Sequence, residues 1–219
     1  MLPGAINRQL SIESRKSEMD DIFITTSYGK VFAKIAGNAN QPVVLGIHGW
    51  SQRNGWHTWE PMMAPLADAG YRVVCVDMPG WGQSTKTVRE MMVGETAVLA
   101  TLSILDKLNV GKAAAIMGKS WGGGVALELA LTYPGRVGKL ILTAPAFQQF
   151  SLLSHIEQPV LLAWAADDPI IPIQTADKYV RGLHHCQRVE YETGGHSAAP
   201  KNAKDFAPKA IKFLKIDDC

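Results

Sequence analysis

The sequence predicts an α/β protein built on a mostly parallel β-sheet. Six short apolar or β-branched runs follow one another along the chain, and most are separated by stretches with the pattern of a helix. This alternation is typical of βαβ units, in which a helix connects two parallel strands. Polar side chains follow several of the runs, at the edge where open α/β sheets bind their ligands. We therefore expect helices on both faces of the sheet and a functional site at its carboxyl edge.

The chain begins with a polar leader, which we assign to residues 1–20, and a single α/β domain is expected over residues 21–219. The leader has no apolar segment of the kind that a signal peptide needs, and its acidic residues disfavour a transit peptide. The domain opens with two alternating runs, 21–27 and 31–36, around a turn that contains glycine. This pattern predicts an antiparallel hairpin at the N-terminus.

The remaining strands are expected at 43–47, 72–76, 113–117, 140–143, 160–165 and 188–191. The helices are expected at 58–69, 90–108, 123–131, 173–181 and 202–214. No internal repeat and no linker rich in Pro, Gly and Ser interrupts this order, which is why one domain is expected.

Composition and charge exclude several classes of function. Hydrophobic residues make up 47% and charged residues 19% of the 219 positions, which is ordinary for a globular protein. The net charge is +2 and no run of Lys and Arg alternates with aromatic residues, so nucleic acid is not an expected partner. No apolar run approaches the ~20 residues of a membrane-spanning helix. The three cysteines, Cys75, Cys186 and Cys219, cannot all pair, which favours a reducing compartment and a cytoplasmic location.

The pentapeptide Gly118-Lys119-Ser120-Trp121-Gly122 stands between the strand 113–117 and the helix 123–131. A G-x-S-x-G pentapeptide alone is weak evidence for a serine nucleophile. Between a strand and a helix it fits a nucleophile elbow, because glycines beside a serine remove the Cβ clashes of a strained turn and leave the hydroxyl exposed. The sequence thus predicts a serine nucleophile at the carboxyl edge of the sheet.

Together with four other segments, this pentapeptide resembles the α/β-hydrolase superfamily over nearly the whole chain. The matching segments are His48-Gly49-Trp50, the loop 77–84, Gly118 to Gly122, Asp168 to Pro172, and Gly195-His196. The order of Ser, Asp and His is that of the superfamily. The resemblance implies a Ser120, His196 and Asp168 triad, and an oxyanion hole made by the backbone N–H groups of Trp50 and Trp121.

Two points about this triad stay open on the sequence alone. The resemblance places the acid at Asp168, directly before Pro169, but Asp167 remains an alternative. Each triad member also has an ordinary structural role open to it: a small packing residue for Ser120, a loop histidine for His196, and a helix N-cap for Asp168. His48 is expected to hydrogen-bond within its own loop rather than to act as the general base.

Three side chains are expected to line the substrate pocket: Trp81, Phe147 and Lys119. Ligand sites are mostly apolar with a few placed polar groups, which suits the two aromatic residues and also the indoles of Trp50 and Trp121. Lys119 stands where a histidine is commoner in the superfamily. It either attracts an anionic substrate group or extends its stem over apolar surface with its charge in water, and we favour the second interpretation.

Many members of the superfamily insert a helical cap between the strands that correspond to 140–143 and 160–165. Here only residues 144–159 separate them, which leaves room for a loop and one short helix. The chain therefore resembles the small hydrolases without a cap, such as CIB-type esterases and acyl-protein thioesterases, more than the lidded branches that cleave C–C bonds. The resemblance implies hydrolysis of a small-molecule carboxylic ester or thioester through an acyl-enzyme, with no metal and no organic cofactor.

Two functions from other classes compete with this interpretation. Gly118-Lys119-Ser120 also resembles the end of a phosphate-binding P-loop, but the glycine required five positions earlier is Ala113, and a strand-like run replaces the loop. A non-catalytic protein that uses the same fold to bind a ligand or partner is the second rival. The sequence does not indicate the oligomeric state.

Overall fold

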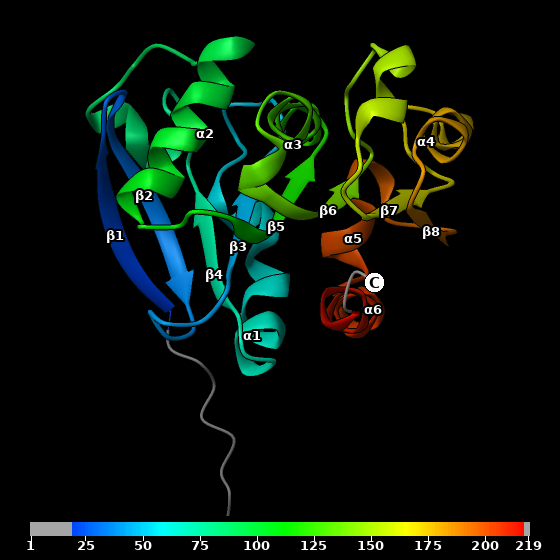
Figure 1. Ribbon diagram of the computed structural model, residues 1–219, viewed down its shortest axis with the longest axis horizontal. Helices are drawn as coiled ribbons and strands as arrows, with labels where there is room; N and C mark the ends of the chain where they lie inside the picture. The colour runs from blue at the N-terminus through cyan, green and yellow to red at the C-terminus, as the bar shows by residue number, and fades with distance from the viewer. Residues whose placement is uncertain (1–18, 217–219) are drawn as a thin grey trace, which may run out of the picture.

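The computed structural model describes residues 19–216 and contains one mostly parallel sheet of eight strands (Figure 1). The strand order is β1-β2-β4-β3-β5-β6-β7-β8. The strands are β1 (Met19–Thr26), β2 (Gly29–Ala36), β3 (Val43–Ile47), β4 (Arg72–Val76), β5 (Ala113–Lys119), β6 (Val137–Thr143), β7 (Val160–Ala165) and β8 (Cys186–Tyr191). β2 pairs antiparallel with both β1 and β4, and all other pairs are parallel. The predicted fold class, including the antiparallel hairpin, is confirmed.

Helices cover both faces of the sheet, as Figure 1 shows. They are α1 (Glu60–Asp68), α2 (Glu95–Lys107), α3 (Trp121–Thr132), α4 (Ala176–Gly182), α5 (Ala198–Lys201) and α6 (Ala203–Lys215). Buried side chains of α2, α3 and α4 pack in one hydrophobic cluster, and those of α1, α5 and α6 in a second cluster on the opposite face. The sheet between them is therefore buried on both sides, and β3, β4 and β7, none of which lies at an edge of the sheet, are almost entirely apolar.

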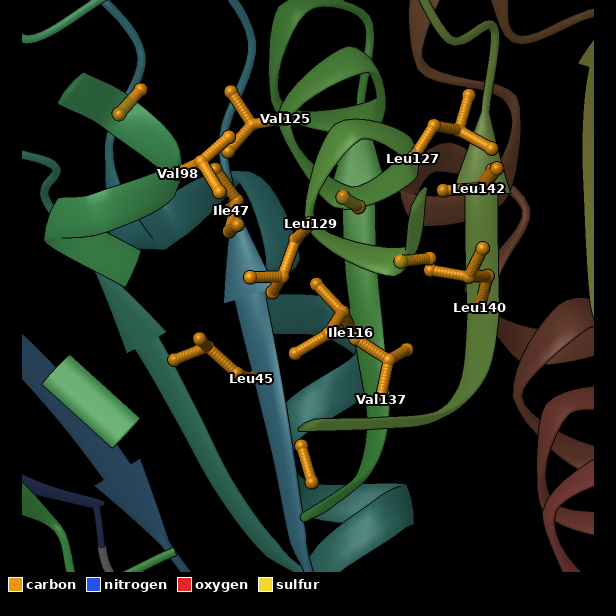
Figure 2. Packing of buried hydrophobic residues seen from close by; sticks show 14 of the residues in the cluster. Leu45, Ile47, Val98, Ile116, Val125, Leu127, Leu129, Val137, Leu140 and Leu142 are labelled. Atoms are coloured by element: carbon orange, nitrogen blue, oxygen red, sulfur yellow. The ribbon is translucent and has the colours of Figure 1, made fainter. Parts of the chain in front are cut away.

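The first cluster fixes α3, and with it the residues at the start of that helix. Figure 2 shows Val125 and Leu129 of α3 pointing toward Ile47 of β3 and Ile116 of β5, with Val98 of α2 beside them. These five side chains are buried. Burial of each aliphatic side chain contributes about 1.5–3 kcal/mol to the stability of the folded state. The elbow at the N-terminus of α3 is thus held on a packed scaffold.

Several element boundaries differ from the sequence-based expectation. The helix expected at 90–108 begins only at Glu95, because Gly94 has a φ of +54°, which no continuous helix can accommodate. The segments before α1 and α4 are 3₁₀ turns, Trp56–Trp59 and Ile173–Thr175. The one-turn helix α5 was not predicted from the sequence, because it is too short to have a recognisable period.

The connection between β6 and β7 contains only a 3₁₀ helix, η4 (Phe150–His155), and no α-helix. This agrees with the expected absence of a cap domain. The predicted leader 1–20 lies outside the described residues except for Met19 and Asp20, which belong to β1. Cys219 also lies outside them. None of the helices within residues 19–216 combines the length and apolarity that a bilayer span requires.

Candidate active site

Ser120 lies at the sharp turn between β5 and α3 with a φ of +50°, in the left-handed region that non-glycine residues rarely adopt. Its N–H donates to the carbonyl of Thr143 at 3.0 Å, and its carbonyl accepts from the N–H of Ala146 at 2.8 Å. A Cβ on Gly118 would lie 2.6 Å from the carbonyl oxygen of Gly122, so the turn tolerates no side chain there. This is the geometry that the pentapeptide predicts.

His196 and Asp168 are brought together by the loops that follow β8 and β7. The Nδ1 atom of His196 lies 2.9 Å from Oδ2 of Asp168 and 3.1 Å from Oδ1. Oδ1 also accepts the N–H groups of Ile170 and Ile171, at 2.8 and 3.0 Å. The carboxylate has no exposed side-chain surface, whereas His196 is partly exposed. A carboxylate at Nδ1 favours the tautomer in which Nδ1 carries the proton and Nε2 is free to accept one.

Asp167, the alternative acid, has a different set of partners. Its carboxylate accepts the backbone N–H of Gly195 at 2.6 Å and that of Gly194 at 3.3 Å. It therefore holds the backbone of the loop that carries His196, while Asp168 contacts the imidazole ring itself.

His48 fixes the loop between β3 and the first 3₁₀ turn, as expected. Its Nδ1 lies 2.8 Å from the carbonyl oxygen of Gly49, to which it donates, and its Nε2 accepts the N–H of Met78 at 3.1 Å. Burial lowers the pKa of His48 to about 4, with smaller contributions from the charges of His57 and Lys119. His48 is therefore neutral near pH 7 and its role is to orient this loop.

The loop held by His48 contacts the first turn of α3. A Cβ on Gly122 would overlap the carbonyl oxygen of His48 and lie 2.6 Å from that of Ile47. Trp50 follows in the same loop, and Trp121 is the first residue of α3, where backbone N–H groups have no partner within the helix. The two N–H groups expected to form an oxyanion hole thus belong to segments in direct contact.

A second loop, residues 77–84, supports the loop that His48 fixes. The sequence of this second loop resembles the superfamily, but the sequence alone did not explain its role. The carboxylate of Asp77 accepts the N–H groups of Trp56 and Gln83, at 2.7 and 2.8 Å. The buried hydroxyl of Ser84 donates to the carbonyl of Asp77 at 2.6 Å and accepts the N–H of Phe32 at 2.9 Å. These bonds fix the loop 77–84 between β2 and the start of α1.

The expectation that Trp81 lines the substrate pocket is wrong. Its side chain has no exposed surface and stacks on Trp121 with ring centroids 4.6 Å apart. The loop 77–84 folds inward after β4 and carries the indole into the core, where its Nε1 has no hydrogen-bond partner. Trp50, by contrast, is 51% exposed and packs edge-on against both indoles. Of the tryptophans in this cluster, Trp50 offers the most surface to a ligand.

Phe147 does line a cavity, which has a volume of about 380 Å³ and lies between the loops after β6 and β7. The cavity is mostly apolar and is bounded by Pro145, Ala146, Phe147, Gln148, Phe150, Ile171 and Thr175. Its walls reach the candidate site directly, because Ala146 is hydrogen-bonded to Ser120 and Ile171 to Asp168. A larger cavity of about 470 Å³ lies at the opposite, amino-terminal edge of the strands, beside Lys112 and Val137.

Tyr179 fixes the loop that forms one wall of the apolar cavity, and this role was not predicted from the sequence. Its buried hydroxyl donates to the carbonyl of Pro145 at 2.7 Å and accepts the N–H of Phe147 at 3.2 Å. The pKa of Tyr179 is raised, mainly by burial. No local pattern connects a tyrosine on α4 with a loop more than thirty residues earlier, so only the tertiary structure reveals this contact.

Lys119, the last residue of β5, is partly buried beside the loop after β3. Its Cδ and Cε atoms each lie 3.5 Å from the point where a Cβ on Gly49 would stand. Burial lowers the pKa of Lys119, the charge of Lys201 lowers it further, and the charge of Asp168 raises it. The side chain therefore packs against the candidate site.

Two family models match the chain. One describes the alpha/beta hydrolase fold and matches residues 42–154, more than half of the chain; a model of an esterase family matches residues 100–210. The chain is 39% identical over 107 residues to a 2-hydroxy-6-oxononadienedioate/2-hydroxy-6-oxononatrienedioate hydrolase from Burkholderia vietnamiensis. It is 36% identical over 103 residues to a 2-hydroxy-6-oxo-6-phenylhexa-2,4-dienoate hydrolase from Comamonas testosteroni. These matches cover 48% and 47% of this chain, but only 36% of each relative's length.

Solved structures share the fold over nearly the whole chain. A CIB-like hydrolase from Thermoplasma acidophilum is 23% identical, with a TM-score of 0.81 over 90% of this chain and 98% of the other. A naproxen esterase from Bacillus subtilis is 16% identical, with a TM-score of 0.79 over 91% and 92% of the two chains. At such low identity the likeness establishes the fold alone.

Proposed function

Because this chain belongs to the α/β-hydrolase family, we propose that it is a serine hydrolase that cleaves a carboxylic ester or thioester through an acyl-enzyme. The observation that supports the proposal most directly is the hydrogen bond between His196 and Asp168, at the same edge of the sheet as the strained elbow of Ser120. A serine hydroxyl is a weak nucleophile near neutral pH, and it needs a base that is itself oriented by a third group.

In the proposed reaction, Ser120 attacks the carbonyl carbon while Nε2 of His196 accepts the hydroxyl proton. Asp168 keeps Nδ1 protonated and stabilises the imidazolium that forms. The negative charge on the former carbonyl oxygen is met by the N–H groups of Trp50 and Trp121, each worth about 3 kcal/mol of transition-state stabilisation. His196 then returns the proton to the departing alcohol or thiol, and a water molecule hydrolyses the acyl-enzyme by the same steps.

The acyl group is proposed to occupy the apolar cavity beside Phe147. The loop that forms its wall is bonded to Ser120 through Ala146, so a chain attached to the serine oxygen has this cavity within reach. A cavity of this size and polarity suits a short or medium acyl chain. With only a 3₁₀ helix between β6 and β7, no helical cap covers it within the described residues.

The curated relatives are named as hydrolases of 2-hydroxy-6-oxo-dienoate compounds, but the matches span well under half of their length. Their substrate class is therefore not carried over to this chain. One such dienoate belongs in the substrate screen beside p-nitrophenyl esters and acyl thioesters of increasing chain length. Preferred turnover of the dienoate would contradict the ester or thioester proposal.

A fluorophosphonate probe tests the proposed nucleophile. The intact protein is expected to be labelled, and Ser120→Ala is expected to lose all labelling because the probe bonds to the activated serine oxygen. Ser103→Ala, on α2, is the matched control and should label like the wild type. The absence of labelling in the intact protein would favour the rival function, a non-catalytic binding protein on the same fold.

A further inference from the structure

Two lysines that the proposed reaction does not use lie beside loops of the candidate active site, Lys119 at the loop after β3 and Lys201 at the loop of His196. Lys119 directly precedes Ser120. In β5 it lies on the same face of the sheet as Ala115 and Met117, which pack in the cluster of α1 and α6. Its side chain thus leaves the carboxyl edge of the sheet on the face where α5 and the His196 loop lie. There its stem packs against Gly49, in the loop that continues to Trp50.

Lys201 lies beside the loop of His196. It is the last residue of α5, the short helix that begins two residues after His196. Its ammonium nitrogen lies 3.8 Å from the point where a Cβ on Gly195 would stand. One lysine therefore lies against the oxyanion loop and the other against the loop of the general base.

Neither of these two cations has an anionic partner among the residues that the structure describes. Asp168 contributes a charge that acts on Lys119, but its oxygens already bind the ring of His196 and two backbone N–H groups. Lys119 is partly buried and Lys201 is exposed, so an anion from solvent that meets both side chains would offset the cost of holding the charge of Lys119 partly out of water. Burial and the charge of Lys201 both lower the pKa of Lys119.

We propose that Lys119 and Lys201 form a cationic subsite that binds an anionic group on the leaving alcohol or thiol of the substrate. The assignment to the leaving group rests on the proposed function and on the position of the acyl cavity. That cavity lies between the loops after β6 and β7, whereas the lysines lie beside the loops after β3 and β8. His196, which protonates the leaving group, belongs to the second of these loops.

The substrate class is therefore an ester or thioester with an apolar acyl chain and a carboxylate or phosphate on the departing group. Both anions pair well with two ammonium groups, which act as point charges. The proposal therefore specifies a negative charge on the departing group and leaves the choice between carboxylate and phosphate to the test. For Lys119 the proposal takes the other interpretation that the sequence left open, in which this lysine attracts an anionic substrate group.

The test uses matched thioesters with the same butyryl group. S-butyryl-3-mercaptopropionate is compared with its uncharged methyl ester, and S-butyryl-phosphopantetheine with S-butyryl-pantetheine, by release of the free thiol. For the wild type we expect kcat/KM on at least one anionic member to exceed that on its neutral partner by about 10-fold, a preference that shrinks as salt is raised. The pair with the larger preference distinguishes carboxylate from phosphate.

Substitutions separate this subsite from general effects on activity. Lys119→Met and Lys201→Met keep the length of the stem without the charge, and each should reduce the anionic-to-neutral ratio of kcat/KM by about 10-fold. Lys201→Arg should restore most of the ratio, because it keeps a cation. Lys107→Met, an exposed lysine on α2, should leave the ratio unchanged. Equal ratios in the wild type and both Met variants would overturn the proposal.

Binding to Ser120→Ala distinguishes failure of this proposal from failure of the proposed function. Calorimetric titration with the anionic and the neutral member of each thioester pair reports binding without turnover. Tighter binding of the anionic member that is lost on adding Lys119→Met supports the subsite, even if the intact protein is not labelled by fluorophosphonate. Labelling and turnover with no preference for either anion would overturn the subsite and leave the serine hydrolase standing.

Discussion

Asp168 binds the ring of His196, with 2.9 Å between Oδ2 and Nδ1, while the adjacent Asp167 binds only the backbone of the loop before that ring. The two neighbouring carboxylates thus position the same histidine in different ways. Asp168 determines the tautomer and orientation of the ring, and Asp167 determines where the loop begins. Their replacement should have unequal consequences.

Asp168→Asn is expected to lower kcat by about 10³- to 10⁴-fold, because an amide at this place no longer stabilises the imidazolium and favours the wrong tautomer. Asp167→Asn keeps an oxygen that can accept from Gly194 and Gly195, so its kcat should fall by less than about 10-fold. Steady-state hydrolysis of p-nitrophenyl butyrate measures both. A larger loss in Asp167→Asn would instead assign the triad acid to Asp167.

Acid should destabilise the protein through His48. The pKa of this buried imidazole is lowered from 6.5 to about 4, so below pH 6.5 the unfolded chain binds a proton that the folded chain refuses. Stability from this group is therefore complete above about pH 6.5 and lost as the pH falls toward about 4, by up to about 3 kcal/mol.

Urea unfolding between about pH 7 and about pH 4.5 tests this linkage. His48→Gln can keep one donor and one acceptor but cannot titrate, so its free energy of unfolding should fall less steeply with acid. His155→Gln, at an exposed position, is the control and should follow the wild type. The same slope in all three proteins would show that His48 does not carry the effect.

The sequence predicted much of this fold because local chemistry determines it. β3, β4 and β7 begin and end where expected. Proline directly precedes β3 and β7, and a polar residue directly follows β3 and β4. The Ser120 elbow was recognisable because only glycine fits beside it. Trp81 and Tyr179 were not, because their surroundings come from segments distant along the chain. Lys201 was not recognisable for a different reason, because its place beside Gly195 depends on a single turn of helix that has no sequence period.

Gly122→Ala should damage both stability and turnover. The added methyl group would overlap the carbonyl oxygens of His48 and Ile47, and these backbone atoms leave little room for relaxation. We expect the free energy of unfolding to fall by about 1–3 kcal/mol, and kcat to fall as the oxyanion loop moves. Gly111→Ala, which would meet nothing within 4 Å, is the control and should retain both. Unchanged kcat in a destabilised Gly122→Ala would separate this contact from the oxyanion hole.

Tyr179→Phe should loosen the acyl cavity while sparing the triad. Removal of the hydroxyl leaves the carbonyl of Pro145 and the N–H of Phe147 without their buried partner, which costs about 1–3 kcal/mol of stability. We expect KM to rise more for hexanoyl than for acetyl p-nitrophenyl esters, because only the longer chain reaches this wall. Tyr133→Phe is the control, since its hydroxyl makes no hydrogen bond within residues 19–216. A KM that rises equally for both esters would place the acyl chain elsewhere.

Trp50 and Trp81 touch each other, yet their substitution should affect different properties. Trp81→Ala removes a fully buried indole and should cost about 3–5 kcal/mol of unfolding free energy, measured in urea. Trp50→Ala removes a half-exposed indole, so its stability loss should be clearly smaller. If Trp50 provides the ligand surface, its loss should raise KM for aromatic esters more than for aliphatic ones. The reverse assignment, a stable Trp81→Ala with a selectively raised KM, would return Trp81 to the pocket.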